Sequence, residues 1–343
     1  MEIQKPNFTI FIPTYNSERY IHSCVESAIS QSYSPFKVVV LDSGSTDGTL
    51  SILKGYEKKS TQLKIIPTDR RLGIVENWSQ IAALADTEWF TILGHDDVLG
   101  LDFLQKMAEL IEQNPRSNVL TSHFDIIDDK GDFYRKCQAI PASQNTADYV
   151  RSRFLGKRDS FATGYVIKTS TYRQVGGIPK YPDLLFADDA LWVLLSQDSL
   201  IPCSQETLFQ YRFHLGSTSG TPDQGRLMDA AIQYLTLLSQ LGNERAALKE
   251  VLHNDAKKQM LPLAKGYLGL TLLRLSYLGQ RADEQPYGQV SRLCLLIQEK
   301  PERVLKSPVI LLLIGMNVTV FRKPLARMFF CLLPSYKSKA RVG

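Results

Sequence analysis

Two pairs of adjacent aspartates are the residues in this sequence best suited to chemistry. Asp96-Asp97 follows an apolar run in the segment LGHDD, and Asp188-Asp189 opens an apolar stretch in FADDALW. Neighbouring carboxylates repel each other unless a cation or a basic partner is present. Oxygen ligands of this kind suit Mg²⁺ or Mn²⁺, which typically also bind substrate phosphates. The first pair therefore suggests a metal site and the second a general base, although a solvent-exposed turn or a helix cap explains either pair without a ligand.

Three further clusters lie where apolar runs end. Pro13 and Tyr15 follow the first run in IPTYN, and Asp42 closes the second run in LDSGSTDGT. A tyrosine ring can stack on a base, and the aspartate can accept hydrogen bonds from a ribose or a base N–H. Capped turns explain most of these residues without a ligand, with Asn16 or Ser17 as the cap of the first helix and Thr46 or Asp47 as the cap of the second. They do not explain an aspartate at the end of an apolar strand.

The third cluster is YRFHLGSTS, in which His214 precedes a loop of small residues. A lone histidine is most often structural. A histidine and an arginine beside a closing loop can instead contact a diphosphate or a metal.

The elements that position these clusters alternate in the first half of the chain. Apolar, strand-like runs alternate with segments of helical spacing: strands over 8–12, 36–41, 63–66 and 89–93, and helices over 17–30, 48–56, 74–85 and 101–113. Strands that are apolar along their length and separated by helices predict a parallel sheet covered on both faces. Ligands bind such sheets at the carboxyl ends of the strands, where the clusters lie.

The second half divides into two textures. Short strand candidates over 119–127, 163–168 and 208–213 suggest an α+β completion of the sheet, and the pattern beyond residue 222 is helical. Gly, Ser, Thr, Pro and Asp gather at 220–224 and mark a boundary. The fold class expected is α/β, with a mostly parallel, Rossmann-like sheet flanked by helices and a helical C-terminal region. We expect two domains, 1–220 and 221–343.

Composition and charge limit the class of protein. The chain has 343 residues and 44% apolar content, enough for a packed core. Eight of its 40 basic residues and none of its 35 acidic residues lie from Arg303 onward, so the tail is basic and favours an anionic partner, nucleic acid or membrane surface. The five cysteines are widely spaced, which argues against a disulfide framework or structural zinc.

Targeting signals are the last compositional observation. The N-terminus shows no secretory pattern, and the longest apolar run, 309–321, is short of the roughly 20 residues that a membrane span needs. We therefore expect a cytoplasmic protein.

The order of the motifs carries a resemblance. The segment TIFIPTYNSERYIHSCVESAISQSYSPFKVVVLDSGSTDGT closely resembles the opening of glycosyltransferase family 2, whose members are inverting enzymes with a GT-A fold, and ILGHDDVL, FADDALW and YRFHLGSTS follow in the family's order. The resemblance covers roughly residues 7–220 and leaves out the helical C-terminal third. It implies a hexosyl-type transferase that moves a sugar from a nucleotide-diphosphate donor, expected to be a UDP-sugar, onto an acceptor hydroxyl.

The resemblance also implies roles for single residues in donor binding. By similarity Pro13, Tyr15 and Asp42 hold the nucleotide, and Arg71, a few positions before Asn77, lines the same site.

In the acidic loop Asp96 lies near the ribose, and Asp97 binds the divalent metal, Mn²⁺ or Mg²⁺. His214 matches a histidine of the loop that closes over the donor, and we count it with the metal site. Gly94 stands where the family often has a further aspartate, a departure that loosens the expected metal geometry.

The catalytic base implied by the resemblance is an aspartate before an apolar helix. Aligning on Trp192 favours Asp188, and aligning on the acidic pair favours Asp189, so both stay candidates. The base takes the acceptor proton while the metal and an arginine neutralise the departing diphosphate.

The expected partners are a nucleotide-sugar donor and a saccharide or lipid-linked saccharide acceptor of polysaccharide or glycolipid synthesis, with no nucleic acid. Apolar and cationic residues mixed over 321–333 suit a helix in a lipid interface at the inner face of the membrane, and a helical subdomain with a solvated basic end is the alternative.

Rival functions lack their motifs. A dinucleotide-binding GxGxxG after the first strand is absent, and so is a phosphate-binding GxxxxGK[ST]. A nucleotidyltransferase usually has a basic, glycine-rich first loop, which PTYNSERY is not. From another class, a non-catalytic sugar-nucleotide binder or a scaffold of a polysaccharide complex would lack a base, for which this chain has two candidates.

Overall fold

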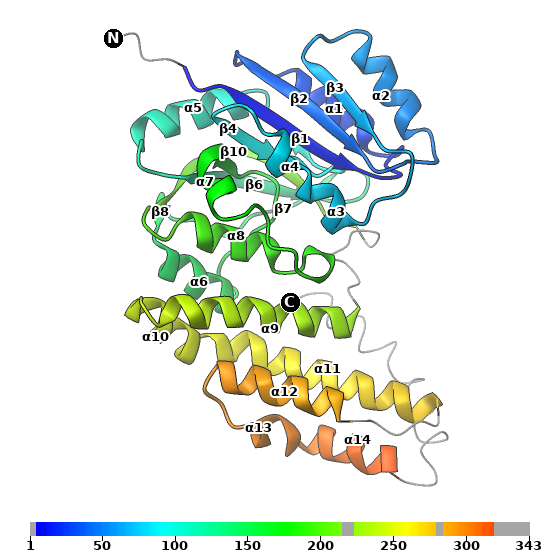
Figure 1. Cartoon of the computed structure of the whole chain (residues 1–343), viewed down its shortest axis with the longest axis vertical. Coiled ribbons are helices and arrows are strands. Elements are labelled where there is room, and N and C mark those ends of the chain that lie inside the picture. Colours follow the sequence, from blue (N-terminus) through cyan, green and yellow to red (C-terminus); the bar gives the residue numbers. More distant parts are fainter. Residues whose placement is uncertain (1–4, 215–222, 279–283, 319–343) are drawn as a thin grey trace. The chain divides into compact units, whose positions relative to one another are not determined.

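The computed structural model describes residues 5–214, 223–278 and 284–318. The chain divides into two compact units, residues 1–222 and 223–343 (Figure 1). The sequence pattern placed this boundary at residue 220.

The first unit is built on one mixed sheet. Its strands, in the order in which they pair, are β3 (Leu63–Pro67), β2 (Phe36–Asp42), β1 (Phe8–Thr14), β4 (Trp89–Ile92), β9 (Val166–Lys168), β6 (Val119–Ile127), β10 (Ile201–Arg212) and β5 (Val98–Leu99). Two short strands lie off this path: β7 (Phe133–Lys136) pairs with β6, and β8 (Ser143–Gln144) pairs with β10. The four N-terminal strands β1 to β4 run parallel, as their apolar character predicts.

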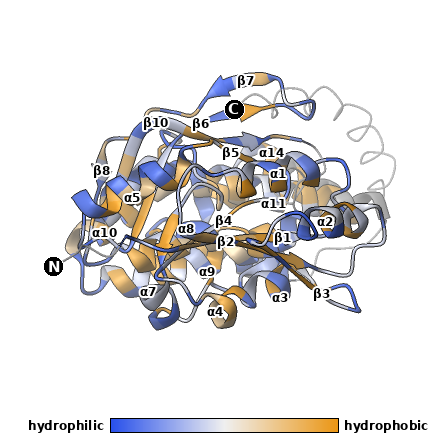
Figure 2. Cartoon of the chain, turned by 90° about the horizontal axis from the view of Figure 1, so that it is seen from above, coloured by the Kyte–Doolittle hydropathy of each residue, from blue (hydrophilic) through white to orange (hydrophobic). Residues whose placement is uncertain are grey.

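Helices cover both faces of this sheet. Figure 2 shows α1 (Ile21–Ile29), α2 (Thr49–Glu57) and α5 (Phe103–Gln113) on one side of β1 and β2, and α3 (Ile74–Ser79), α4 (Ile81–Leu84) and α7 (Thr169–Gln174) on the other. The strands between them are coloured as hydrophobic and the connecting loops as hydrophilic. The α/β class with a mostly parallel sheet is confirmed.

Two more helices and a short turn complete this unit. Helix α6 spans Thr146–Phe154, the 3₁₀ turn η1 spans Pro182–Leu184, and α8 spans Ala187–Leu195. Apart from α8, the sequence pattern did not predict these elements. They are short, and α6 has a largely polar sequence.

The strand register brings the predicted loops to one edge. Thr14 of β1 lies opposite Asp42 of β2, which lies opposite Pro67 of β3. On the other side of β1, Phe11 pairs with Ile92 at the end of β4, so the LGHDD loop leaves the sheet beside IPTYN. Three of the predicted site loops therefore start from neighbouring carboxyl ends.

The first of these loops differs from its prediction. Neither Asn16 nor Ser17 caps α1, which begins only at Ile21. Asn16 has a left-handed backbone (φ 45°), and its side-chain oxygen accepts from the N–H of Thr46 at 2.8 Å. The Ser17 hydroxyl bonds to the Thr14 hydroxyl at 2.6 Å, and the Ser17 N–H donates to the Thr49 hydroxyl at 2.8 Å. The Asn16 side chain and the Ser17 backbone therefore tie the first loop to the second.

The second unit is helical. Its helices are α9 (Gln224–Gly242), α10 (Ala246–Asn254), α11 (Ala256–Leu278), α12 (Gln285–Leu296), α13 (Glu302–Leu305) and α14 (Pro308–Val318). They pack on one another through buried aliphatic residues such as Leu235, Leu268 and Leu293. Within the described part of the chain, no helix combines the length and the apolar character needed to cross a bilayer. The predicted interfacial segment over 321–333 lies outside the described residues.

Candidate active site

Tyr15 and Arg71 come together from different loops. The Arg71 guanidinium carbon lies 4.4 Å from the centroid of the Tyr15 ring, a cation–π contact. Arg71 is exposed, while its neighbour Arg70 turns to an ion pair with Glu76. An aromatic face with an arginine beside it is an arrangement on which a base or a phosphate can bind.

Asp42 is the last residue of β2 and lies at the same edge of the sheet. It is 1% exposed, and its two carboxylate oxygens accept from Ser45, one from the hydroxyl at 2.6 Å and one from the N–H at 3.1 Å. The Ser45 hydroxyl in turn accepts from the N–H of Asn16 at 2.9 Å. Carboxylate oxygens have further lone pairs, so Asp42 is held in place and retains acceptor capacity.

Asp97 is anchored inside the acidic loop. It is 2% exposed, its Oδ1 accepts from the backbone N–H of Arg212 at 2.8 Å, and its Oδ2 accepts from the Thr163 hydroxyl at 2.6 Å. Burial, and then the negative charge of Asp96, raise the pKa of Asp97 well above its usual range, against the lowering effect of Thr163 and Arg212.

Asp96 faces a different partner. His214 Nε2 lies 2.8 Å from Asp96 Oδ2, and the His214 ring also lies against Tyr20, with 5.2 Å between ring centroids. Burial alone would raise the pKa of Asp96, but the His214 contact and the charges of His95 and His214 lower it. The structure therefore places His214 on Asp96 rather than on Asp97.

Arg212 joins these residues from the end of β10. It is 5% exposed, its Nε donates to the carbonyl of Asp96 at 2.8 Å, and its Nη1 donates to the carbonyl of Asp128 at 3.1 Å. Its guanidinium carbon lies 5.0 Å from the Tyr20 ring centroid. A buried cation that binds the backbone of the acidic loop lowers the cost of two neighbouring carboxylates.

Gly94 fits the crowding of this loop. A Cβ at Gly94 would lie 2.7 Å from Asp97 Oδ2 and 3.0 Å from Asp96 Oδ1, closer than such contacts allow. The place of the aspartate that the family often has here is thus filled by the two carboxylates that follow.

The donor set of this loop suits a divalent metal in chemical type. Asp96 and Asp97 supply carboxylates and His214 an imidazole. Burial and the charge of Asp96 raise the pKa of Asp97, so without a cation the ionised form of Asp97 is disfavoured, and a nearby dication would favour it. Among the described residues, however, no three such side chains converge as a ready-made metal site.

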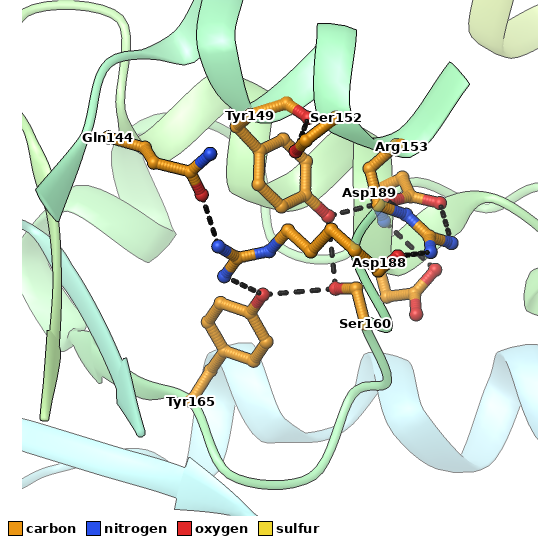
Figure 3. A network of polar contacts seen from close by, with 9 residues as sticks. Gln144, Tyr149, Ser152, Arg153, Ser160, Tyr165, Asp188 and Asp189 are labelled. Carbon is orange, nitrogen blue, oxygen red and sulfur yellow. Dashed lines mark hydrogen bonds and ion pairs between the residues drawn. The ribbon is translucent and has the colours of Figure 1, made fainter. Parts of the chain in front are cut away.

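Asp189 is the anchored member of the second pair. It is 4% exposed and accepts from Tyr149 Oη at 2.5 Å, from Arg153 Nε at 2.7 Å and from Arg153 Nη2 at 3.0 Å (Figure 3). The two parallel Arg153 contacts make a bidentate pair. These contacts leave Asp189 little capacity to accept a substrate proton.

Asp188 is half-buried and lies outside this cluster of donors. Its Oδ1 accepts from the backbone N–H of Asp189 at 2.9 Å. Burial, followed by the charge of Asp189, raises the pKa of Asp188 to about 7, against the lowering effect of Arg153. A carboxylate with this pKa can take up and release a proton near neutral pH.

Tyr211 connects the two pairs. Burial, and then the negative charges of Asp97, Asp96 and Asp188, raise its pKa. Its ring stacks on Phe161 with 3.5 Å between centroids. Charges from both acidic pairs therefore act on the Tyr211 hydroxyl.

Several supporting residues were not predicted from sequence. Thr163 and Tyr20 lie far along the chain from the acidic loop, and Tyr149 and Arg153 lie in a helix that the pattern did not predict. A hydroxyl or an arginine in an ordinary surface-like segment carries no local signal for such contacts.

An open pocket of about 590 Å³ lies at the end of β3, beside the loop that carries Arg71. The lining residues are Pro67, Thr68, Asp69, Arg70, Leu72, Glu76 and Gln80. Tyr15, Asp42 and Arg71 do not line it.

Comparison with known proteins finds a family model that matches the first half of the chain. Residues 9–174 match the model described as glycosyl transferase family 2. An uncharacterized glycosyltransferase of Haemophilus influenzae is 25% identical over 226 residues, which cover 62% of this chain and 68% of the relative. A Mycobacterium tuberculosis glycosyltransferase of PGL/p-HBAD biosynthesis is 32% identical over 116 residues, 34% of this chain and 45% of the relative.

Solved structures agree in fold. Staphylococcus aureus TarS 1–349, crystallised with UDP-GlcNAc, superposes with a TM-score of 0.63 at 16% identity and covers 89% of this chain and 90% of that one. The mannosyltransferase PcManGT of Pyrobaculum calidifontis, in complex with GDP-Man and Mn²⁺, gives a TM-score of 0.53 at 16% identity and covers 92% and 88%.

The family match includes Tyr15, Asp42, Arg71 and the Asp96-Asp97 loop and ends before Asp188 and His214. By that match and by the GT-A type of its fold, residues 9–174 of this chain are a glycosyl transferase family 2 domain.

Proposed function

We propose that this chain is an inverting glycosyltransferase in which Asp188 is the general base. The observation that carries the proposal is the division of labour within the second acidic pair. Asp189 accepts hydrogen bonds from Tyr149 and Arg153, whereas Asp188 is only half-buried and has a pKa of about 7. Of the two aspartates, only Asp188 is open to an acceptor and has a pKa near neutral pH, as a base that takes the proton of the acceptor hydroxyl requires.

The proposed chemistry is a direct displacement. Asp188 accepts the proton of the acceptor hydroxyl while the hydroxyl oxygen forms a bond to the anomeric carbon, on the face opposite the nucleotide. The bond from that carbon to the diphosphate oxygen breaks, and the diphosphate leaves with the electron pair. Configuration at the anomeric carbon inverts, and no second base is needed because the leaving group requires charge stabilisation rather than a proton.

Donor binding is assigned to the edge formed by the first three loops. Tyr15 with Arg71 offers a stacking face, Asp42 an acceptor for ribose or base, and Pro13 the strand end that places them. We propose a UDP-sugar, supported by the resemblance to TarS with UDP-GlcNAc.

A divalent cation, Mn²⁺ or Mg²⁺, is proposed at Asp96, Asp97 and His214. The Mn²⁺ in PcManGT and the carboxylate–imidazole donor set here support it. When bound, it supplies compensation for the charge that develops on the departing diphosphate.

The proposed acceptor is a saccharide or lipid-linked saccharide, and the proposed location is the cytoplasmic face of a membrane. Relatives are named for teichuronic acid and for PGL/p-HBAD biosynthesis. On α14, Val309 is 62% and Leu311 51% exposed, close in sequence to the basic tail. Exposed aliphatic side chains beside cations suit an anionic bilayer surface. Full-length protein should float with anionic vesicles and not with neutral ones, and a protein that floats with neither contradicts this part.

Turnover tests the function itself. UDP-, GDP- and dTDP-sugars are screened for transfer and for slow donor hydrolysis, and the anomeric configuration of the product is read by NMR. We expect Asp188→Asn to lower kcat by about 10²–10⁴-fold while Asp86→Asn, at an exposed aspartate paired with Lys37, leaves it unchanged. Donor binding without turnover in the wild type would instead favour a non-catalytic sugar-nucleotide binder.

A further inference from the structure

The base-bearing helix has an unusual start. Phe186, the residue before α8, has a left-handed backbone (φ 59°), and Asp183 (φ 51°) and Leu184 (φ 58°) share this conformation three and two residues earlier. None of the three is glycine, and such conformations persist only where surrounding contacts hold them. No side chain caps the N-terminus of α8. Something other than local backbone preference must therefore hold the first turn.

Arg153 of α6 binds the third residue of α8, Asp189. Its side chain is 23% exposed, and its three nitrogens are all used: Nε and Nη2 bind the two oxygens of Asp189, and Nη1 donates to the carbonyl of Arg158 at 2.8 Å. Figure 3 shows this fork closing on Asp189, with Asp188 beside it. The planar guanidinium fixes the carboxylate in two directions at once.

The contact continues to the base through the backbone. The N–H of Asp189 donates to Asp188 Oδ1 at 2.9 Å, so a shift of the anchored residue moves the hydrogen bond that orients its neighbour. Tyr149 supports the anchor from the other side, with its hydroxyl 2.5 Å from Asp189 Oδ1.

Electrostatics act along the same path. The titratable groups around Asp188 are Asp189 on its own helix, Arg153 from α6 and Tyr211 from β10. Burial and then Asp189 raise the pKa of Asp188, and Arg153 lowers it. The cation is therefore placed to keep the base from holding its proton too tightly.

We infer that Arg153 is a positioning residue for the transfer reaction, which acts on Asp188 through its bidentate ion pair with Asp189. The inference rests on the proposed role of Asp188 as base. Arg153 itself touches no reacting atom. It fixes the first turn of α8 and sets the charge around the base.

The experiment compares pH profiles of kcat. The acid limb is the fall of kcat at low pH, which follows protonation of Asp188. Arg153→Gln removes a neighbouring positive charge, so the pKa of Asp188 should rise and the acid limb should move to higher pH by about one unit or more. Asp189→Asn removes the negative charge and should move the limb downward. Arg153→Lys keeps the charge and should leave the limb near its wild-type position, with kcat lowered through lost bidentate geometry. A merely structural role predicts that all three lose stability with the limb unmoved, which would overturn the inference.

Arg151→Gln is the matched control. Arg151 lies on the same helix and pairs with Asp148 at 3.0 Å through a partly exposed contact. The Arg151→Gln variant should have the same kcat as the wild type and the same acid limb in its pH profile. A shift of that limb as large as the shift in Arg153→Gln would contradict a path through Asp189.

A second readout separates this inference from the proposed function. Carboxyl ¹³C NMR on the full chain, with Asp188→Asn to assign the resonance, follows Asp188 without any substrate. If the wild type transfers no sugar but the Asp188 titration still moves upward in Arg153→Gln and downward in Asp189→Asn, the proposed function fails and the electrostatic coupling stands. If both variants fold and the Asp188 titration is unchanged in both, Arg153 and Asp189 are not coupled to Asp188, and this result would overturn the inference at any level of activity.

Discussion

The two aspartate pairs are alike in sequence and different in their surroundings. In each pair one carboxylate is almost wholly buried and accepts hydrogen bonds from the protein on both oxygens: Asp97 from a backbone N–H and a threonine hydroxyl, Asp189 from a tyrosine and an arginine. The open member differs. Asp96 faces His214 and its pKa is lowered. The cation nearest Asp188, Arg153, is paired with Asp189, and burial together with the charge of Asp189 raises the pKa of Asp188 to about 7. The same dipeptide thus gives an anion in one place and a proton acceptor in the other, because the neighbours differ.

The largest expected effect separates the anchored from the open member of the helix pair. Asp189→Ala leaves the Arg153 guanidinium, which is only 23% exposed, without its partner, and breaking a largely buried pair costs about 3–5 kcal/mol. Asp188→Ala removes no ion pair and should cost less than about 1 kcal/mol. Urea unfolding followed by circular dichroism measures both. Equal costs for the two variants would remove the distinction between anchor and base.

The pH dependence sharpens the comparison from the side of Asp188. Because its pKa in the fold is about 7, against 3.8 ordinarily, kcat should fall about tenfold per pH unit below 7. The fold also binds this proton more tightly than the unfolded chain does. The stability it contributes is full below about pH 4 and is lost as the pH rises through 7.

Asp188→Asn removes that term, so its free energy of unfolding relative to the wild type should be higher at pH 8 than at pH 5. A relative stability that does not change between these pH values would contradict the raised pKa.

The predictability of the fold and the site differed for physical reasons. The parallel core strands β1 to β4 and the loops at their ends follow from apolar runs closed by polar clusters, so Asp42 and the Asp96-Asp97 loop were placed from sequence. Which carboxylate of a pair stays open was not predictable, because the deciding partners Thr163, Arg153 and Tyr149 reach it through tertiary contacts.

Crowding in the acidic loop gives a smaller effect. Gly94→Ala would place a methyl 2.7 Å from Asp97 Oδ2, and Asp97 cannot retreat because both its oxygens are bonded. We expect metal-dependent donor affinity to fall by about tenfold, or about 1.4 kcal/mol, by calorimetric titration. Gly55→Ala on α2, where a Cβ meets nothing within 4 Å, is the control. Unchanged affinity in Gly94→Ala would show that the Asp97 carboxylate need not be held in this place.

The smallest expected effect belongs to an ion pair of the same residue types as Arg153 and Asp189. Arg151 and Asp148 are 37% and 50% exposed, so Arg151→Gln should change the free energy of unfolding by no more than about 0.5 kcal/mol. A loss comparable with that of Asp189→Ala would mean that burial does not distinguish the two ion pairs.

The most direct test of the account asks whether the two pairs serve different steps. Binding of UDP-, GDP- and dTDP-sugars is measured by calorimetry with Mn²⁺, with Mg²⁺ and with chelator, on wild type, Asp97→Ala and Asp188→Asn. The account predicts metal-dependent binding of one donor by the wild type and by Asp188→Asn, and its loss in Asp97→Ala. Binding of no donor under any metal condition, or equal loss in both variants, would contradict it.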